Sequence, residues 1–230
     1  MLRRSPPESS GTSRVARARG KEDRPSGLVD RLSLEMGYPR RDRMSSMSSF
    51  ASRSMWSVDS RTIVYAAIGA ALYGVLALFS VVIPGSNNVS VRPAFAIVPF
   101  FGYAFGPVVG LFTGLVGNAI VDQLSGYGLL TAWNWHIANG LVGLLAGIFA
   151  ASSIARLGGS KIIGAAAVAA LSVAIGMLFV FSDMVVFGND FNTALTGSYL
   201  WVLVPDLIAG VILVPILALA WEPLKESLGR

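Results

Sequence analysis

Residues 62–83 read TIVYAAIGAALYGVLALFSVVI, an apolar run without a single charged residue that ends at Pro84 and Gly85. A helix needs about 20 consecutive apolar residues to cross the hydrocarbon core of a bilayer, and this run is long enough. We therefore predict that residues 62–83 form the first of several membrane-spanning helices.

Comparable apolar runs occur farther along the chain, at 133–154, 162–186 and 198–221, and short basic or polar stretches separate them. Residues 91–124 are ambiguous, because they form either one long kinked helix or two short helices that meet at Gly106-Pro107. The composition supports a membrane protein, since 53% of the 230 residues are hydrophobic and 13% are charged. Soluble domains carry about 25% charged residues.

The placement of basic residues indicates how many spans there are. Two helices in the ambiguous region give six spans and place the basic N-terminal residues, Arg156, Lys161, Lys225 and Arg230 on one side. One helix would give five spans and move Arg156 and Lys161 to the other side. Because Lys and Arg in short loops favour the cytoplasmic side, we predict an all-α membrane protein, a six-transmembrane-helix bundle with cytoplasmic N- and C-termini.

The predicted domains are a basic tail over 1–60, a six-helix membrane domain over 61–221 and a short cytoplasmic C-terminal tail over 222–230. Up to Arg61 there are 13 Lys or Arg residues against 7 Asp or Glu, and after it 5 against 6. The tail is rich in Arg, Ser, Pro and Gly, so we expect it to be disordered. A start at Met44, Met47 or Met55 would make part of it a start-site artefact. Beside an apolar body it is expected to contact anionic lipid rather than nucleic acid.

The chain contains few residues of the types that catalysis or metal binding requires. There is no cysteine, which excludes a disulfide, a thiol nucleophile and a Cys-based metal site. The one histidine, His136, stands beside two tryptophans, and a structural hydrogen bond is its default role. No Gly-rich phosphate loop and no hydrolase or metalloprotease motif is present. We predict no catalytic residue, no metal and no cofactor, so the chain is expected not to be an enzyme.

Several polar residues gather toward the outer half of the predicted bundle, as a binding cup that opens outward would require. Gly110, Gly114, Asn118 and Asp122 are four apart and share one helix face. A carboxylate within the membrane usually faces a cavity or a partner. The predicted substrate-binding residues are Asn87, Asn88, Arg92, Asn118, Asp122, Tyr127, Trp133, Asn139 and Asp206.

Each of these side chains also has a structural interpretation. The glycines indicate close helix packing, and Asn118 or Asp122 would form hydrogen bonds at a helix end. Arg92 either reaches into the cup or extends toward the lipid headgroups, and Asp206 either binds ligand or pairs with Arg92. The aromatic residues form either a stacking wall for a flat heterocycle or an interfacial girdle.

Small residues four apart line one side of the first predicted helix. Ala66, Ala70 and Gly74 form one row, and Ala67 and Ala71 form a second row beside it. Such rows let another helix approach closely. That helix belongs either to the same chain or to a partner membrane subunit, and spacing alone does not separate the two.

Three stretches of the chain resemble a known family. Residues 67–76 (AIGAALYGVL), 88–122 (NVSVRPAFAIVPFFGYAFGPVVGLFTGLVGNAIVD) and 133–147 (WNWHIANGLVGLLAG) look like the membrane-embedded S components of energy-coupling factor (ECF) vitamin importers, in the branch grouped with riboflavin-type S components. The blocks SVRPA and FGPVVG are the most specific. The family typically shows a Gly-His pair where this chain has Gly117-Asn118.

The resemblance implies a six-helix bundle that holds its substrate near the outer face under the first loop. It implies a membrane coupling subunit and two cytoplasmic ATPase subunits as partners, with docking through Ala66, Ala67, Ala70 and Ala71. The expected function is capture of a small heterocyclic vitamin or precursor, riboflavin-like or pyrimidine-type, at the plasma membrane. The alternatives are a standalone channel or proton-coupled secondary carrier that uses Asp122 and Asp206, and a membrane scaffold that recruits a partner through its basic tail.

Overall fold

The computed structural model describes residues 54–86 and 89–227, which form a helical bundle and one short antiparallel hairpin. The helices are α2 (Ser60–Leu76), α3 (Ile97–Phe105), α4 (Pro107–Leu124), α5 (Trp133–Ala150), α6 (Lys161–Gly176), α7 (Asp183–Val186) and α8 (Leu200–Ser227). Short helical segments of other pitch are η2 (Pro93–Ala96), η3 (Ser153–Gly159), η4 (Met177–Ser182) and η5 (Thr193–Tyr199). The strands are β1 (Val81–Val82) and β2 (Ser90–Val91). Nearly all of the predicted disordered tail lies outside the described residues.

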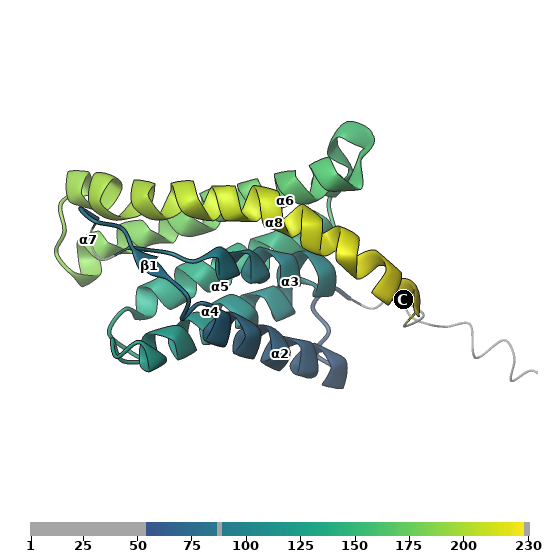
Figure 1. The fold of residues 1–230 in the computed structure, drawn as a ribbon, viewed down its shortest axis with the longest axis horizontal. Helices are drawn as coiled ribbons and strands as arrows, with labels where there is room; N and C mark the ends of the chain where they lie inside the picture. Colours follow the sequence, from purple (N-terminus) through teal and green to yellow (C-terminus); the bar gives the residue numbers. More distant parts are fainter. Residues whose placement is uncertain (1–53, 87–88, 228–230) are drawn as a thin grey trace, which may run out of the picture. The chain divides into compact units, whose positions relative to one another are not determined.

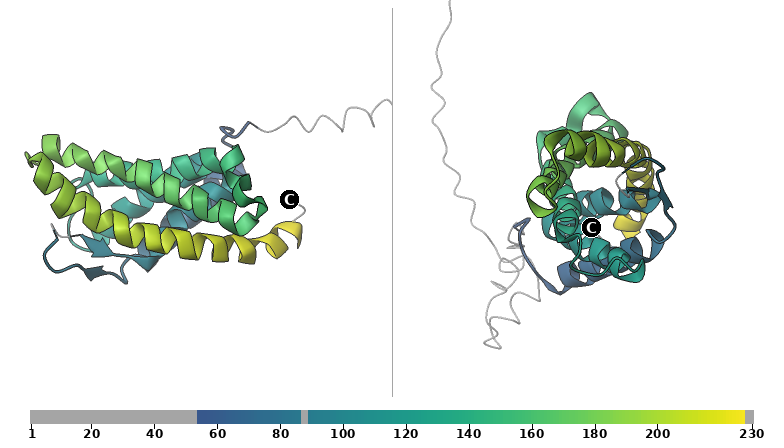
Figure 2. Two further views of the ribbon diagram at one scale, coloured as in Figure 1. Left: turned by 90° about the horizontal axis from the view of Figure 1, so that it is seen from above. Right: turned by 90° about the vertical axis from the view of Figure 1, so that its left-hand side faces the viewer.

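Helices α6 and α8 lie side by side, α2 and α4 form a second pair, and α3 and α5 lie between them (Figure 1). Seen end-on, the helices surround a common centre (Figure 2). The small hairpin and α7 lie at the end of the bundle where α8 begins, and α8 runs from there to the opposite end.

Helix α2 is shorter than the apolar run that predicted it. It begins after Asp59, whose carboxylate accepts a hydrogen bond from the Thr62 amide at 2.8 Å, and it ends at Leu76. The last seven residues of the run, 77–83, lie outside the helix, and the pair Val81–Val82 forms strand β1 against β2. These residues are β-branched, which favours extended backbone. Hydropathy does not change at Leu76, so the apolar run alone could not mark this end.

Residues 91–124 contain two helices, as one of the two predicted alternatives required. Helix α3 ends at Phe105 and α4 begins at Pro107. Gly106 between them has φ 103°, a left-handed conformation that glycine adopts without steric cost. Pro107 lacks an amide hydrogen and suits the first turn of a helix. The break therefore follows directly from the Gly-Pro pair.

Among the described residues, three helical segments are long and apolar enough to cross a membrane: Pro107–Leu124, Lys161–Val186 and Thr193–Ser227. Helix α5 and η3, bent by 62°, make a fourth if they are counted as one span. Two shorter apolar helices, Ser60–Leu76 and Pro93–Phe105, complete the set. The chain is thus built as a multi-pass membrane protein, while the prediction of six spans with cytoplasmic ends stays a prediction.

Asp190 forms hydrogen bonds in the loop that precedes the last long helix. The carboxylate of Asp190 accepts hydrogen bonds from the hydroxyl of Thr193 at 2.6 Å and from its amide at 3.1 Å. These bonds lower the pKa of the Asp190 carboxyl. The chain then enters η5, a π-helical segment that leads directly into α8.

The predicted row of Gly110, Gly114 and Asn118 on α4 packs against α5 along a seam. A Cβ atom on Gly110 would overlap the carbonyl group of Gly143, and one on Gly143 would overlap the carbonyl group of Gly110. One turn away, a Cβ atom on Gly114 would overlap the backbone of Asn139. The backbones of α4 and α5 therefore touch, and the seam leads to Asn139.

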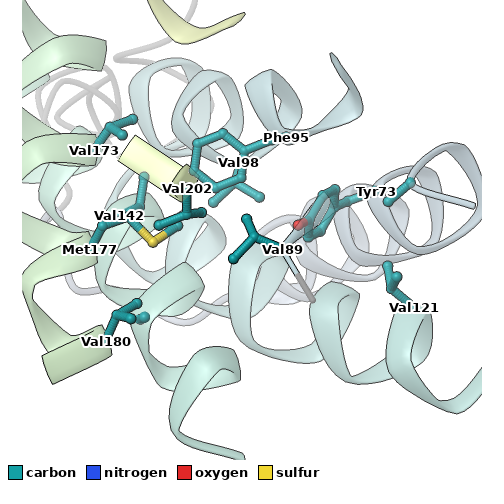
Figure 3. Packing of buried hydrophobic residues seen from close by; sticks show 12 residues of the cluster. Tyr73, Val89, Phe95, Val98, Val121, Val142, Val173, Met177, Val180 and Val202 are labelled. Carbon is teal, nitrogen blue, oxygen red and sulfur yellow. The ribbon is translucent and has the colours of Figure 1, made fainter. Parts of the chain in front are cut away.

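The apolar core lies between α3, α5, α6 and α8. Figure 3 shows Val98, Val142, Val173, Met177 and Val202 close to one another at its centre, with Tyr73 and Val121 to one side. A second apolar cluster contains Ala165, Ala169 and Val214 with the rings of the α3 aromatic residues. Large apolar side chains that stay exposed on α2, α6 and α8 are expected to face lipid, as a membrane protein requires.

Candidate functional site

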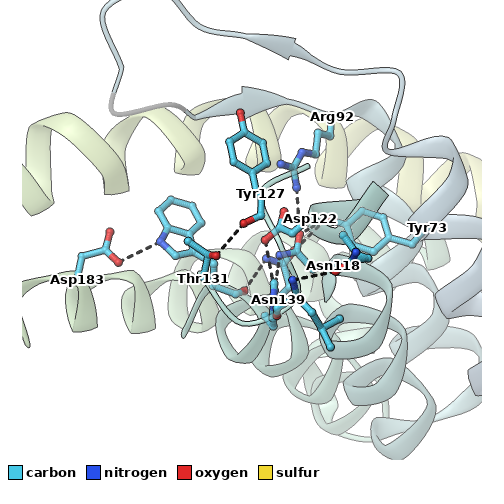
Figure 4. Close-up of polar contacts among 12 residues, drawn as sticks. Tyr73, Arg92, Asn118, Asp122, Tyr127, Thr131, Asn139 and Asp183 are labelled. Carbon is cyan, nitrogen blue, oxygen red and sulfur yellow. Dashed lines mark hydrogen bonds and ion pairs between the residues drawn. The ribbon is translucent and has the colours of Figure 1, made fainter. Parts of the chain in front are cut away.

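A cavity of about 240 Å³ lies where α2, α4, α5 and α8 converge near the hairpin. Figure 4 shows Tyr73 of α2, Asn118 of α4 and Asn139 of α5 close together there, and Val202 and Asp206 of α8 also line the cavity. Its polar lining residues are Tyr73, Ser90, Arg92, Asn118, Asp122, Tyr127, Thr131, Asn139, Asp183 and Asp206. Its remaining lining residues are Val89, Phe95, Ala132, Trp135, Met177, Phe187 and Val202.

Six of the nine predicted substrate-binding residues line this cavity, and they are Arg92, Asn118, Asp122, Tyr127, Asn139 and Asp206. Trp133 does not line it and is 45% exposed, whereas Trp135 does. Residues two apart in a helix point to different sides, so Trp135 rather than Trp133 faces this cavity. Asn87 and Asn88 lie outside the described residues, although Val89 and Ser90 next to them line the cavity.

Asn118 is the centre of a buried hydrogen-bond network. Its side-chain oxygen accepts a hydrogen bond from Arg92 Nη1 at 3.0 Å and lies 3.3 Å from the Tyr73 hydroxyl. The same hydroxyl lies 3.1 Å from Asn139 Oδ1, so its one proton is shared between two amide oxygens. Asn139 Nδ2 donates in turn to the Trp135 carbonyl at 2.8 Å. The network joins α2, α4 and α5 at the cavity wall.

The network also sets the orientation of His136. Its Nε2 lies 2.9 Å from the Leu129 carbonyl oxygen, which only accepts, so Nε2 carries a proton. Its Nδ1 lies 2.9 Å from Asn118 Nδ2, which only donates, so Nδ1 accepts. Both assignments describe a neutral imidazole. The 3.6 Å approach of Nδ1 to Asp122 Oδ2 is therefore no ion pair in this arrangement.

Asp183 holds the aromatic wall of the cavity in place. Its Oδ1 atom accepts hydrogen bonds from Asn134 Nδ2 at 2.7 Å and from the Trp135 indole nitrogen at 3.0 Å. Figure 4 shows the carboxylate of Asp183 bonded to this indole. The two bonds connect α7 to α5 and fix the plane of the Trp135 ring beside the cavity.

Two further carboxylates face the cavity with few partners. Asp206 is 4% exposed and Asp122 is 5% exposed. Within the described residues, neither carboxylate makes a hydrogen bond, and Asp122 Oδ2 lies 3.6 Å from His136 Nδ1. Arg92 has its own spare capacity, because its buried Nε atom has no hydrogen-bond partner in the described part of the chain.

Some lining residues escaped the sequence analysis. Tyr73 lies inside an apolar run and reads as a packing residue, yet it is 1% exposed and bonded through its hydroxyl. A buried tyrosine hydroxyl needs a partner, and that is the signal that could have identified it. Thr131 and Phe187 lie outside regular helices, and nothing in their spacing points to the cavity.

The two rows of small residues on α2 point in different directions. Ala66 and Ala70 are buried and face α4, whereas Ala67 and Ala71 are exposed. An apolar groove of about 240 Å³ lies between α2 and α4. It is lined by Val58, Thr62, Ile63, Ala66, Ala67, Ala70, Val108, Phe112 and Val116.

Metal binding finds no support in the geometry. Across residues 54–86 and 89–227, no three His, Cys, Asp or Glu side chains come together as a metal site would need. The chemistry of the cavity is thus that of hydrogen bonding, charge and ring contact.

Comparison with known proteins places these features in context. The family model described as "ECF-type riboflavin transporter, S component" matches residues 57–222. Two UPF0397 proteins of Streptococcus pneumoniae, from strains CGSP14 and ATCC 700669 / Spain 23F-1, are each 42% identical over 89 residues. The match covers 39% of this chain and 47% of each relative, so the chain spans about half the length of the curated relatives it matches. No solved structure matches the chain.

Proposed function

Because the chain belongs to the family of ECF-type riboflavin transporter S components, we propose that it binds a small heterocyclic vitamin or vitamin precursor and delivers it inward. The family is one of substrate-specific transporter subunits rather than enzymes. The observation that carries the proposal is the cavity in which Arg92, Asn118 and Asp206 converge beside an aromatic wall. Ligand pockets in proteins combine apolar walls with a few fixed polar groups in this way.

The proposed substrate is a flat ring that contacts Trp135 and is bound at its polar edge by the Asn118 network. Riboflavin-like and pyrimidine-type heterocycles both have this character. The side chains of the network form hydrogen bonds with one another, and these bonds hold them in fixed orientations before a ligand binds. Preorganisation of this kind lowers the entropic cost of binding.

The proposed partners are a membrane coupling subunit and two cytoplasmic ATPases. The chain has no phosphate-binding loop of its own, so the energy for uptake would come from those subunits. We assign docking to the exposed side of α2, where Ala67 and Ala71 lie and where the apolar groove opens. Small exposed residues let a partner helix approach closely in a membrane.

The proposed topology in the plasma membrane has six spans and cytoplasmic ends. Helix α2 has 17 residues and is about 25 Å long, so it would need thinning of a bilayer whose core is about 30 Å thick.

Because the chain lacks cysteine, a single introduced cysteine reports on which side of the membrane its position lies. Leu130→Cys should react with a membrane-impermeant thiol reagent in intact cells, and Leu157→Cys only after permeabilisation. The reverse pattern would overturn the topology.

Ligand identification tests the function most directly. Mass spectrometry of small molecules released from the full chain, purified from its native membrane, should recover one heterocycle of vitamin size. Its addition back should raise the unfolding temperature. Recovery of lipid alone, together with no thermal shift from any vitamin, would overturn the proposal. Uptake by this chain alone in liposomes would instead support the channel or carrier alternative.

A further inference from the structure

We propose that the cavity selects a small organic cation, a nitrogen heterocycle of one or two rings whose positively charged N–H groups are bound by Asp206 and Asp122. This inference rests on the proposed function and deepens it, because it names the charge and size of the substrate. It follows from an inventory of the hydrogen-bonding groups that face the cavity and of those that remain free.

The amide donors of Asn118 and Asn139 and the hydroxyl donor of Tyr73 are already used within the protein. Asn118 Nδ2 contacts the His136 ring at 2.9 Å, and Asn139 Nδ2 donates to the Trp135 carbonyl at 2.8 Å. The Tyr73 hydroxyl donates to the amide oxygens of both asparagines. A ligand that needs hydrogen-bond donors from these groups would have to break a buried bond, which costs about 1–3 kcal/mol.

The Arg92 Nε donor has no hydrogen-bond partner among the described residues, but the charged acceptors that line the cavity outnumber it. Asp206 lines the cavity at 4% exposure and makes no hydrogen bond within the described residues. Asp122 lies 3.6 Å from the His136 ring, which is too long for a hydrogen bond. Asp183 uses Oδ1 for its two donors, and no bond to its second oxygen occurs in the described part of the chain. The ligand is therefore expected to supply the donors.

The charges point the same way. Among the described lining residues, the guanidinium of Arg92 is the one permanent positive charge, and three carboxylates line the same cavity. The hydrogen bonds of His136 describe a neutral ring, so it adds no positive charge. A buried carboxylate without a cation is costly, more so within a membrane. A cationic ligand would neutralise part of this excess, whereas an anionic ligand would increase it.

The size of the cavity limits the ligand further. Its volume is about 240 Å³, which is below the usual range of about 300–1,000 Å³ for ligand pockets. Phe95, Met177 and Val202 give one apolar wall, and the Trp135 ring gives another. Such a space fits a flat ligand of one or two rings better than a three-ring ligand with a polar chain.

A matched series of one-ring probes tests the charge. Benzamidinium, benzamide and benzoate share a ring and differ in carrying a positive charge, no charge and a negative charge. Calorimetry on the full chain in detergent, freed of co-purified ligand, should give benzamidinium an affinity roughly tenfold or more above that of benzamide, because charge-assisted hydrogen bonds are about twice as strong as neutral ones. Benzoate should not bind.

Equal affinity for the three probes, preference for benzoate, or no binding by any of them at millimolar concentration would overturn the inference. Equal affinity would mean that the carboxyl groups are protonated in the empty cavity, so that they do not select charge. A three-ring neutral vitamin recovered from the native protein would also overturn it, while leaving the proposed importer function intact.

Substitution of one carboxylate tests the assignment to residues. Asp206→Asn keeps the shape of the side chain and removes its charge, so benzamidinium affinity should fall roughly tenfold and benzamide affinity should change little. Glu226→Gln is the control, because it removes an exposed carboxylate far along α8 by the same chemical change. If Asp206→Asn weakens both probes equally, or if the control matches it, Asp206 does not bind the cation. If benzamidinium binds as expected but cells that express the chain take up no heterocyclic solute, the result supports the inferred charge selectivity and contradicts the importer function.

Discussion

Helices α4 and α5 meet in two different ways along their length. At the seam, Gly110 and Gly143 bring the two backbones into contact, and no side chain could be inserted between them. At the cavity, the same helices carry Asn118, Asn139 and His136, which meet through hydrogen bonds. The glycines of the seam thus bring the helices close enough for Asn118 and Asn139, one to two turns beyond, to share the Tyr73 hydroxyl. Close packing at one level positions the polar network at the next.

The seam should be the least tolerant part of the bundle. Gly143→Ala places a Cβ atom on the carbonyl group of Gly110, so one helix must shift, and we expect a loss of about 3 kcal/mol of stability or more. Thermal unfolding in detergent measures the effect. Gly210→Ala is the matched control, because its Cβ atom would lie 3.5 Å from that of Ala169, an ordinary contact. Equal melting temperatures for the two variants would show that the backbones do not touch.

The polar network should come second. Asn118→Ala leaves Tyr73, Arg92 and His136 without their shared partner, so we expect a loss of about 1–3 kcal/mol of stability. Affinity for the recovered ligand should fall as well. Asn192→Ala, at an exposed position, is the control and should change neither quantity. An Asn118→Ala protein with unchanged stability and binding would remove the network from the site.

The outer face of α2 should separate binding from transport. Leucine at Ala67 and Ala71 enlarges exposed side chains, so the expected change in stability is within about 0.5 kcal/mol. Ligand binding should persist, while co-purification with the coupling subunit and cellular uptake are lost. The control is Ala70→Leu, which should destabilise the fold because Ala70 is buried against α4. Normal uptake by the Ala67 and Ala71 variant would place docking elsewhere.

The smallest effect is expected at a polar contact outside both regions. Lys161 Nζ and Glu222 Oε2 are 3.0 Å apart, but the lysine side chain is 72% exposed. Exposed ion pairs contribute about 0–1 kcal/mol, so Glu222→Gln should leave the melting temperature nearly unchanged. A loss of stability as large as that of Asn118→Ala would mean that this ion pair stabilises the packing of α6 on α8 more than its exposure indicates.

The sequence predicted most of the cavity because its residues stand out against an apolar background. Asn118, Asp122 and Asp206 are polar positions inside long apolar helices, where such residues usually have a role. The break at Gly106 was also readable, since only two alternatives were open and the Gly-Pro pair favours one. Asp183 was not among the predicted site residues, because its bonds to α5 depend on a tertiary contact that spacing does not reveal.

Other features depend on which side of a helix faces its neighbours, and residue type alone does not indicate this. The two alanine rows on α2 look equivalent in sequence, and only the position of α4 makes one row face inward. The choice between Trp133 and Trp135 depends in the same way on the rotation of α5. The end of α2 at Leu76 is set by pairing of Val81 with Val91, a contact between residues on either side of a loop.

The aromatic residues at the far end of the bundle bear on how a substrate could pass. The ring of Phe105 lies 4.4 Å from that of Tyr65, 5.0 Å from that of Phe101 and 4.9 Å from that of Trp221, measured between centroids. Asp206 and Trp221 lie on the same helix, about 22 Å apart along its axis. A cluster of packed rings therefore lies beyond the cavity along α8. The proposed inward delivery would require these rings to separate before a bound solute passes, so release would be coupled to a change in helix packing.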